Sequence, residues 1–176
     1  MKIRLEQDGD DVAEVHRIAF GGDGDKVAGL VKALRRDDPG LLSLVAEVDG
    51  AVVGNVMFTR SLLDAPPRLV DVLVLSPLAV LPGFQRRGVG QALVKHGLEE
   101  ADRTGTPLVF LEGDPAYYSK WGFRAGGDLG FRRPSLRIPD VAFQVYPLAA
   151  HEPWMTGTLV YSATFWDHDL VGLRDS

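Results

Sequence analysis

Hydrophobic residues near the N-terminus first follow a period of two and then a helical period. Ile3 and Leu5 alternate with polar residues, which predicts a short first strand. A helix is predicted next, capped by Asp10 or Asp11, with an apolar face made of Val12, Val15, Ile18 and Ala19. A second helix is predicted over residues 25–36, with an inward face made of Val27, Leu30, Val31 and Leu34.

Three strands are predicted in the middle of the chain. Residues 41–48 and 51–62 flank Asp49-Gly50, a dipeptide typical of hairpin turns. A long third strand is predicted over residues 70–81. Pro77 interrupts this strand, and because proline donates no ladder hydrogen bond, we expect a bulge or a sheet edge there.

Helices and strands alternate in the second half. A helix is predicted over 88–103, a short buried strand over 107–111, and a further helix from Asp114-Pro115, where proline suits the first turn. Strands are then expected from Phe123 and over 141–148. A late strand or hairpin is expected in the tail, where Leu159, Tyr161 and Phe165 are the apolar positions.

The order of these elements, β-α-α-β-β-β-α-β-α-β-β, favours a mixed α/β fold with a central sheet flanked by helices. With 176 residues the chain is long enough to bury a sizeable core, and we expect a single domain over 1–176. Hydrophobic residues make up 45% of the chain, which is ordinary for a soluble globular protein. No apolar run approaches the roughly 20 residues of a membrane span.

The segment with the clearest chemistry is 85–90, Gln-Arg-Arg-Gly-Val-Gly, which joins the 70–81 strand to an amphipathic helix. The first backbone N–H groups of a helix have no partner within it, and the helix dipole adds partial positive charge there. Gly88 and Gly90 carry no Cβ, so a ligand could approach the backbone closely. The segment therefore predicts an anion site, most naturally for a phosphate.

Two common phosphate-binding motifs do not fit this segment. A P-loop requires lysine and a hydroxyl residue after its last glycine, but Val89 and Gly90 follow Gly88. A dinucleotide fingerprint requires a third glycine where Leu93 stands. ATP and NAD are therefore disfavoured as ligands.

The spelling Q-x-x-G-x-G after an apolar strand resembles the acetyl-CoA motif of the GNAT superfamily of N-acetyltransferases. A second segment, 115–123, matches the later P-x-Y-Y-x-x-x-G-F pattern of that family. The resemblance is specific over roughly 73–126 and weak beyond about Leu129. Glutamine stands at position 85, where arginine is the commonest family residue.

The resemblance implies a GNAT-like fold in which two parallel strands splay apart around acetyl-CoA. The 85–90 loop would hold the CoA pyrophosphate, and the strand backbone before it would hold pantetheine. The cofactor-binding residues that the resemblance implies are Leu78, Ala79, Val80, Gln85, Arg86, Arg87, Gly88, Val89, Gly90 and Gln91. The implied activity is acetyl transfer to an amine by direct attack in a ternary complex, with no metal.

The resemblance also implies an acid, since Tyr118 lies four residues before the Gly-Phe pair, where the family often has a tyrosine that protonates the leaving thiolate. A phenol with a pKa of about 10 keeps its proton at neutral pH. An amine must lose a proton before it attacks, and Glu112 at the end of the second strand is the candidate base. Asp71, Glu47 and a water chain are alternatives.

Other chemistries find little support in the sequence. The chain has no cysteine, and no serine lies in a nucleophile elbow. The four histidines show no metal-binding spacing, so no metal is expected. A net charge of −5 disfavours a nucleic-acid partner. The first six residues alternate like a strand rather than a signal peptide, and we expect a cytoplasmic protein with no membrane partner.

The sequence thus predicts an acetyl-CoA-dependent N-acetyltransferase. Its acceptor would be a small-molecule or protein amine that the sequence does not identify, and a homodimer is compatible with the family. The alternatives are a non-catalytic CoA-binding or sensor module on the same fold, a nucleotide-binding protein, and a structural domain that binds a partner.

Overall fold

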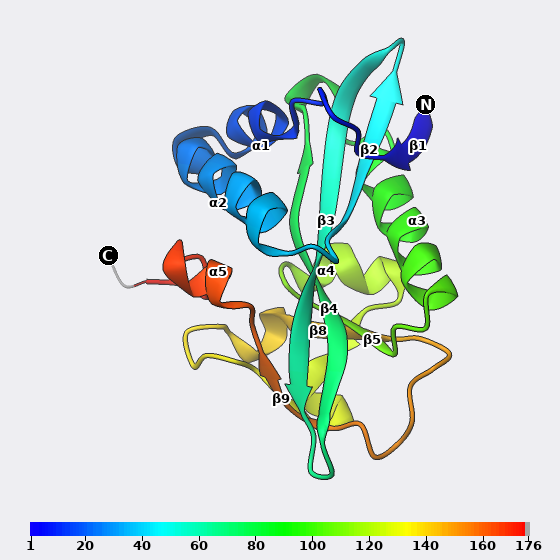
Figure 1. Ribbon diagram of the computed structural model, residues 1–176, viewed down its shortest axis with the longest axis vertical. Helices are drawn as coiled ribbons and strands as arrows, with labels where there is room; N and C mark the ends of the chain where they lie inside the picture. The colour runs from blue at the N-terminus through cyan, green and yellow to red at the C-terminus, as the bar shows by residue number, and fades with distance from the viewer. Residues whose placement is uncertain (175–176) are drawn as a thin grey trace. The chain divides into compact units, whose positions relative to one another are not determined.

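The computed structural model describes residues 1–174, which form two compact units. The first comprises Met1–Thr59 and Leu75–Glu100, and the second comprises Arg60–Val74 and the described chain from Ala101 onward. Two long strands, β3 (Ala51–Asp64) and β4 (Leu69–Val80), contribute residues to both units. The fold is mixed α/β with a central, mostly antiparallel sheet and flanking helices, which confirms the predicted fold class (Figure 1).

In the first unit, three antiparallel strands follow from the predicted alternation. β1 (Lys2–Leu5) pairs with β2 (Leu42–Val48), and β2 pairs with β3. The turn between β2 and β3 has positive φ at Asp49 (49°) and at Gly50 (80°), which suits the twist of a two-residue hairpin. Ser76–Pro77 in β4 is a cis peptide bond, and the strand continues through it to Val80.

Helices cover both faces of β3 within the first unit. Side chains alternate along a strand, so Gly54 and Phe58 point to one face and Asn55 to the other. α3 (Val89–Arg103) packs on the face of Gly54 and Phe58. α1 (Val12–Phe20) contacts Asn55 on the opposite face, and α2 (Gly24–Asp37) packs beside α1 (Figure 1).

The inward face of α1 differs from the prediction. Val12 and Val15 are buried, but Ile18 is 42% exposed, so its predicted core position is wrong. At about 100° per residue, Ile18 points roughly 240° away from Val12, off the face that begins there. His16 lies on that face instead and is fully buried.

His16 is held by a polar network in the core of the first unit. Its Nε2 lies 2.8 Å from Asn55 Oδ1, while Asn55 Nδ2 donates to Ser43 Oγ and to the Leu44 carbonyl. Because the Asn55 amide nitrogen is occupied as a donor, its oxygen accepts from His16, and we assign the proton to Nε2. Burial lowers the pKa of His16 to about 4.

The second unit contains Arg60–Asp64 of β3 and Leu69–Val74 of β4, which pair with further strands. β5 (Leu108–Glu112) runs parallel to β4 with Leu73 opposite Val109, and antiparallel to β8 (Phe143–Pro147). β6 (Arg124–Ala125) adds to β8. β9 (Gly157–Val160) pairs with the end of β3, and β7 (Phe131–Arg132) pairs with β9. Phe110 lies between Phe131 and Phe143, with ring centroids 5.1 and 5.7 Å away.

Two short helices complete the second unit, α4 (Pro115–Tyr118) and α5 (Ala163–Asp167). Leu159 lies in β9 as expected, but Phe165 lies in α5, so the prediction of a continuing strand is wrong there. The Ser162 hydroxyl accepts from the N–H of Thr164 and begins the helix. The described 3₁₀ turns are Gly21–Asp23, Pro82–Phe84, Ser119–Trp121, Gly126–Leu129 and Asp140–Ala142.

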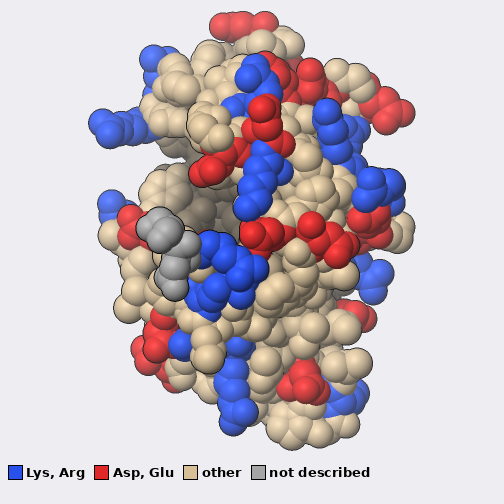
Figure 2. All heavy atoms as spheres, turned by 90° about the vertical axis from the view of Figure 1, so that its left-hand side faces the viewer, with Lys and Arg blue, Asp and Glu red and all other residues tan. Residues whose placement is uncertain are grey.

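Across residues 1–174, none of the helices combines the length and the apolar character needed to cross a bilayer. Figure 2 shows acidic and basic side chains interspersed over one face.

Candidate functional site

The predicted phosphate loop lies in the first unit, where its start is fixed by backbone hydrogen bonds. After β4, Leu81 N–H donates to the Val53 carbonyl of β3 at 2.8 Å. Phe84 N–H then donates to the Leu81 carbonyl, also at 2.8 Å, and closes a 3₁₀ turn over Pro82–Phe84. The loop therefore leaves the strand in a defined direction.

Positive φ angles shape the rest of the loop. Arg86 has φ 60° and Gly88 has φ 80°. A Cβ on Gly88 would meet no atom within 4 Å, so the space beside it is open. Arg86 is a larger residue in the left-handed region, which is uncommon and marks a turn held by its surroundings. The loop exposes Gln85, Arg86, Arg87 and Gly88.

The start of α3 leaves several backbone donors without a partner in the helix. The first α3 bond between backbone groups at helical spacing runs from Ala92 N–H to the Gly88 carbonyl at 3.0 Å. The N–H groups of Val89, Gly90 and Gln91 precede it, so the helix offers them no acceptor. Together with the helix dipole, these donors fit a phosphate group.

Gln85 has a second role that the sequence did not reveal. Its side-chain Nε2 donates to the Val80 carbonyl at 3.0 Å, which ties the loop back to the end of β4. Arg87 lies over the Phe84 ring, 5.7 Å from its centroid. The two side chains brace the loop on either side of Arg86.

The strand before the loop packs closely on β3 and α3. Ala79 is buried, and Leu78 and Val80 are half-buried. A Cβ on Gly54 would lie 3.2 Å from the Ala79 carbonyl oxygen and 3.1 Å from the side chains of Val89 and Leu93. Gly54 is thus a site-supporting residue, and it could be read from the sequence only as a glycine in a strand, a sign of close packing.

Tyr118 lies in the second unit, at the end of α4. Asp114 caps this helix by accepting from Ala116 N–H at 2.9 Å. The Tyr118 ring packs edge-on against Tyr117, Trp121 and Phe123, with centroids 5.0, 5.6 and 5.8 Å away. Burial is the main cause that raises the pKa of Tyr118. Among residues 1–174 its hydroxyl has no hydrogen-bond partner.

Gly113 allows the Tyr118 ring to approach the backbone. A Cβ at position 113 would lie 2.6 Å from Tyr118 Cε2, closer than real side chains come. Gly113 is itself fixed, because its N–H donates to the Ala142 carbonyl and its carbonyl accepts from Gln144 Nε2. The backbone after β5 and the Tyr118 ring therefore constrain each other.

Glu112 ends β5 one residue before Gly113 and is half-buried. Its two carboxylate oxygens accept from Gly172 N–H at 3.3 and 3.2 Å. Burial raises the pKa of Glu112, while the Gly172 hydrogen bond and the nearby Arg137 charge act in the opposite direction. A carboxylate with a raised pKa is a stronger base than an exposed one.

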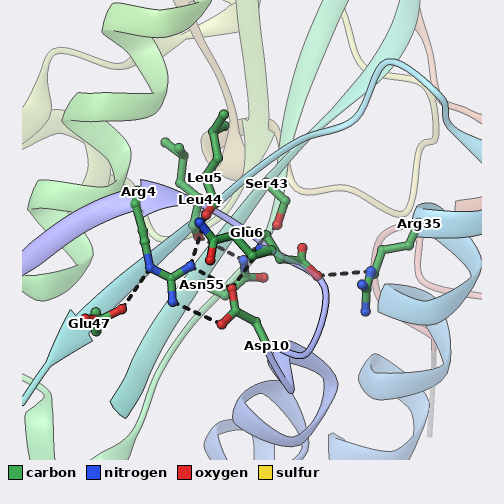
Figure 3. A network of polar contacts seen from close by, with 10 residues as sticks. Arg4, Leu5, Glu6, Asp10, Arg35, Ser43, Leu44, Glu47 and Asn55 are labelled. Carbon is green, nitrogen blue, oxygen red and sulfur yellow. Dashed lines mark hydrogen bonds and ion pairs between the residues drawn. The ribbon is translucent and has the colours of Figure 1, made fainter. Parts of the chain in front are cut away.

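The two alternative bases have other environments. Glu47 accepts from Arg4 Nε at 2.8 Å, and Arg4 also donates to Asp10 at 2.7 Å, so Glu47 belongs to a network that holds β1 (Figure 3). Asp71 is largely exposed and lies 3.5 Å from Arg60. Glu47 is half-buried like Glu112 but is paired directly with the Arg4 guanidinium, and Asp71 is exposed, so we keep Glu112, whose pKa burial raises, as the candidate base.

The predicted residues thus fall into two sets. The loop and strand residues 78–80 and 85–91 lie together in the first unit, and Glu112 and Tyr118 lie together in the second. The described residues contain no group of three or more His, Asp or Glu side chains placed to hold a metal.

Comparison with known proteins identifies the family. The profile of the acetyltransferase (GNAT) domain matches residues 39–125. The uncharacterized N-acetyltransferase YjhQ of Escherichia coli K12 is 36% identical over 161 residues, which cover 88% of this chain and 87% of that protein. The chain belongs to the GNAT family of N-acetyltransferases. The match to the profile includes the loop, Glu112 and Tyr118 but ends before the tail of this GNAT protein.

Two solved structures share the fold of this GNAT protein. The GNAT N-acetyltransferase YhbS of E. coli, solved in complex with CoA, has a TM-score of 0.80 at 31% identity, covering 93% of this chain and 91% of that one. A GNAT acetyltransferase of Brucella melitensis, solved with acetyl-CoA, has a TM-score of 0.74 at 30% identity, covering 93% and 97%. This GNAT protein is accordingly an acyltransferase by family.

Proposed function

We propose that this protein transfers the acetyl group of acetyl-CoA to an amine by direct attack in a ternary complex. The observation that carries the proposal is the set of N–H groups from Val89 to Gln91 beside the open space at Gly88. This arrangement suits a pyrophosphate, and the YhbS and Brucella relatives were solved with CoA and acetyl-CoA. Acetyl-CoA supplies an activated thioester to the reaction.

Binding of the donor is assigned to the first unit. The N–H groups of Val89, Gly90 and Gln91 hold the pyrophosphate, and Arg86 and Arg87 add positive charge. The backbone of Leu78, Ala79 and Val80 contacts the pantetheine arm. The Val80 carbonyl also accepts from Gln85 Nε2, which ties the loop to this strand.

Proton transfer is assigned to the second unit. Glu112 accepts a proton from the incoming ammonium group, since only the neutral amine is a nucleophile. Tyr118 holds a proton at neutral pH and donates it to the departing sulfur. The free hydroxyl of Tyr118 supports this role, and the half-buried carboxylate with its raised pKa supports the role of Glu112. The products are an N-acetylated amine and CoA.

Release of free thiol from acetyl-CoA in the presence of a panel of amines tests the proposal. The panel should include polyamines, amino acids, aminoglycosides and lysine peptides. Thiol release with at least one amine, and its loss in Tyr118→Phe, would support acetyl transfer. Binding of acetyl-CoA without thiol release in the presence of any amine would favour the non-catalytic CoA-binding module instead.

A single domain, a homodimer and a cytoplasmic location stay predictions.

A further inference from the structure

The segment that follows α5 is tied to the end of β5 in the second unit. Gly172 N–H donates to both oxygens of Glu112 at 3.3 and 3.2 Å, across 60 positions of sequence. Arg137 holds the segment on both sides of Gly172: its Nη2 donates to the Val171 carbonyl at 2.8 Å, and its carbonyl accepts from Leu173 N–H at 3.1 Å. Val171 is 1% exposed and anchors the segment in the core.

Position 172 accepts only glycine without rearrangement. Its φ is +65°, in the left-handed region that side chains disfavour. A Cβ there would lie 2.7 Å from the Arg137 carbonyl carbon and 2.8 Å from Arg137 Cβ. The close approach of the two backbones brings the Gly172 N–H to the carboxylate.

Some groups around Glu112 stabilise its ionised carboxylate, and others destabilise it. Arg137 contributes a positive charge that favours the ionised carboxylate. Tyr161 is 5% exposed, and both burial and the Glu112 charge raise the pKa of its hydroxyl, so it faces Glu112 as a neutral phenol. The neighbour of Glu112 on β8 is Phe143, which is buried and apolar. Only Gly172 and Arg137 oppose the desolvation of Glu112.

We propose that Val171–Leu173 and Arg137 form a positioning element of the acetyl-transfer site, which holds the Glu112 carboxylate in one orientation and keeps it ionised. The inference rests on the proposed role of Glu112 as the base. It extends the site into a tail that lies outside the residues matched by the GNAT profile.

The Gly172→Ala variant tests the element, with Gly105→Ala as the matched control. Gly105 also has a positive φ, +82°, but a Cβ there meets nothing within 4 Å, so only Gly172→Ala adds a collision to the backbone strain. Displacement of the 172 N–H removes a hydrogen bond to the charged carboxylate, while Tyr161 and Phe143 still bury it. The pKa of Glu112 should therefore rise.

Two readouts follow this change. NMR of isotope-labelled glutamate carboxyl carbons, with Glu112 assigned by its loss in Glu112→Gln, should show Glu112 titrating at higher pH in Gly172→Ala only. The acid limb of the kcat/KM profile should move to higher pH. At the acid end of the profile, kcat/KM should be about tenfold lower in Gly172→Ala than in the wild type, which is the effect expected from the loss of one hydrogen bond to a charged group. Unchanged titration and an unchanged acid limb would overturn the inference.

Arg137 provides a second, independent test. Arg137→Met removes the charge and the bond to Val171, and should move both readouts in the same direction as Gly172→Ala. Arg137→Lys keeps the charge, so the pKa of Glu112 in this variant should lie closer to its wild-type value than in Arg137→Met. The NMR titration requires no acetyl transfer, so it separates the two proposals. A shifted Glu112 in a protein without thiol release would contradict the proposed function, whereas active variants with an unshifted Glu112 would contradict the positioning element alone.

Discussion

The candidate site residues in the two units of this GNAT protein differ in kind. In the first unit, the candidate site is mostly backbone: N–H groups at the start of α3, shaped by positive φ at Arg86 and Gly88. In the second unit, it consists of two half-buried side chains, Tyr118 and Glu112, whose surroundings include residues distant in the sequence. A backbone site is encoded in a short motif, whereas a side-chain site is set by the tertiary fold. Four predictions test this contrast.

The largest expected effect is on the second unit. Tyr118→Phe removes one hydroxyl and should lower kcat by about 10²- to 10⁴-fold, the usual contribution of a general acid. The ring and its aromatic contacts remain, so the KM for acetyl-CoA should stay close to that of the wild type. Steady-state thiol release measures both constants. Tyr117→Phe is the control, because Tyr117 is the exposed neighbour, and equal losses in the two variants would refute a specific role for Tyr118.

The next effect concerns the backbone site. Gly88→Asp places a negative charge where a phosphate is expected, and should weaken acetyl-CoA binding about a hundredfold, or about 2.7 kcal/mol. Aspartate tolerates a positive φ better than most residues. Gly105→Asp has nearly the same φ, +82° against +80°, and the same open surroundings, and it should bind normally. Calorimetric titration with CoA gives both affinities. Normal binding by Gly88→Asp would show that CoA does not bind at this loop.

A third prediction sharpens the comparison, since the first unit also contains a buried titratable side chain. The pKa of His16 is about 4 in the folded protein, below the value of about 6.5 in an unfolded chain. As pH falls below about 6.5, His16 becomes protonated in the unfolded state but stays neutral in the folded state, so the free energy of unfolding decreases. The free energy of unfolding should drop by about 2 kcal/mol between about pH 7 and pH 5 from this group alone.

Urea unfolding at the two pH values measures this drop. His16→Gln should lack it, and His96→Gln, which alters an exposed histidine, should keep it. A drop of the same size in His16→Gln would assign the acid sensitivity to other groups.

The smallest expected effect is on the positioning of Tyr118. Gly113→Ala puts a Cβ 2.6 Å from the ring, so the ring must shift. We expect kcat to fall about tenfold, because small misplacements of reacting groups are costly. Gly127→Ala, where a Cβ meets nothing within 4 Å, should leave kcat unchanged. Thiol-release kinetics compare the two, and equal kcat values would show that the ring adapts without loss.

Much of the first unit could be predicted from local pattern. The two helices, the hairpin at Asp49-Gly50 and the helix after the loop are confirmed, because hydrophobic period, caps and turn residues act over a few positions. The sequence placed Ile18 on the buried face of α1, where the structure has His16. This was missed because the burial of His16 depends on its hydrogen bond to Asn55, 39 residues away. The hold of Gln85 on Val80 was missed because a motif does not tell which of its side chains is structural.

The second unit was less predictable, and its tail least of all. Strand β5 and the capped start of α4 followed from the sequence, as did the place of Tyr118. Phe165 was misassigned because Ser162 begins a helix just after β9. The contact between Glu112 and Gly172 has no local signature, since both residues are ordinary until the fold brings them together.

The most direct test of the central claim is thermal unfolding of the protein with acetyl-CoA, CoA, ATP or NAD, each added separately in excess. A ligand at about 100 times its Kd stabilises the folded state by about 2.7 kcal/mol, which raises the Tm by several degrees. We predict this rise with acetyl-CoA and CoA and not with ATP or NAD. No rise with either CoA compound would contradict the assignment of the loop to acetyl-CoA.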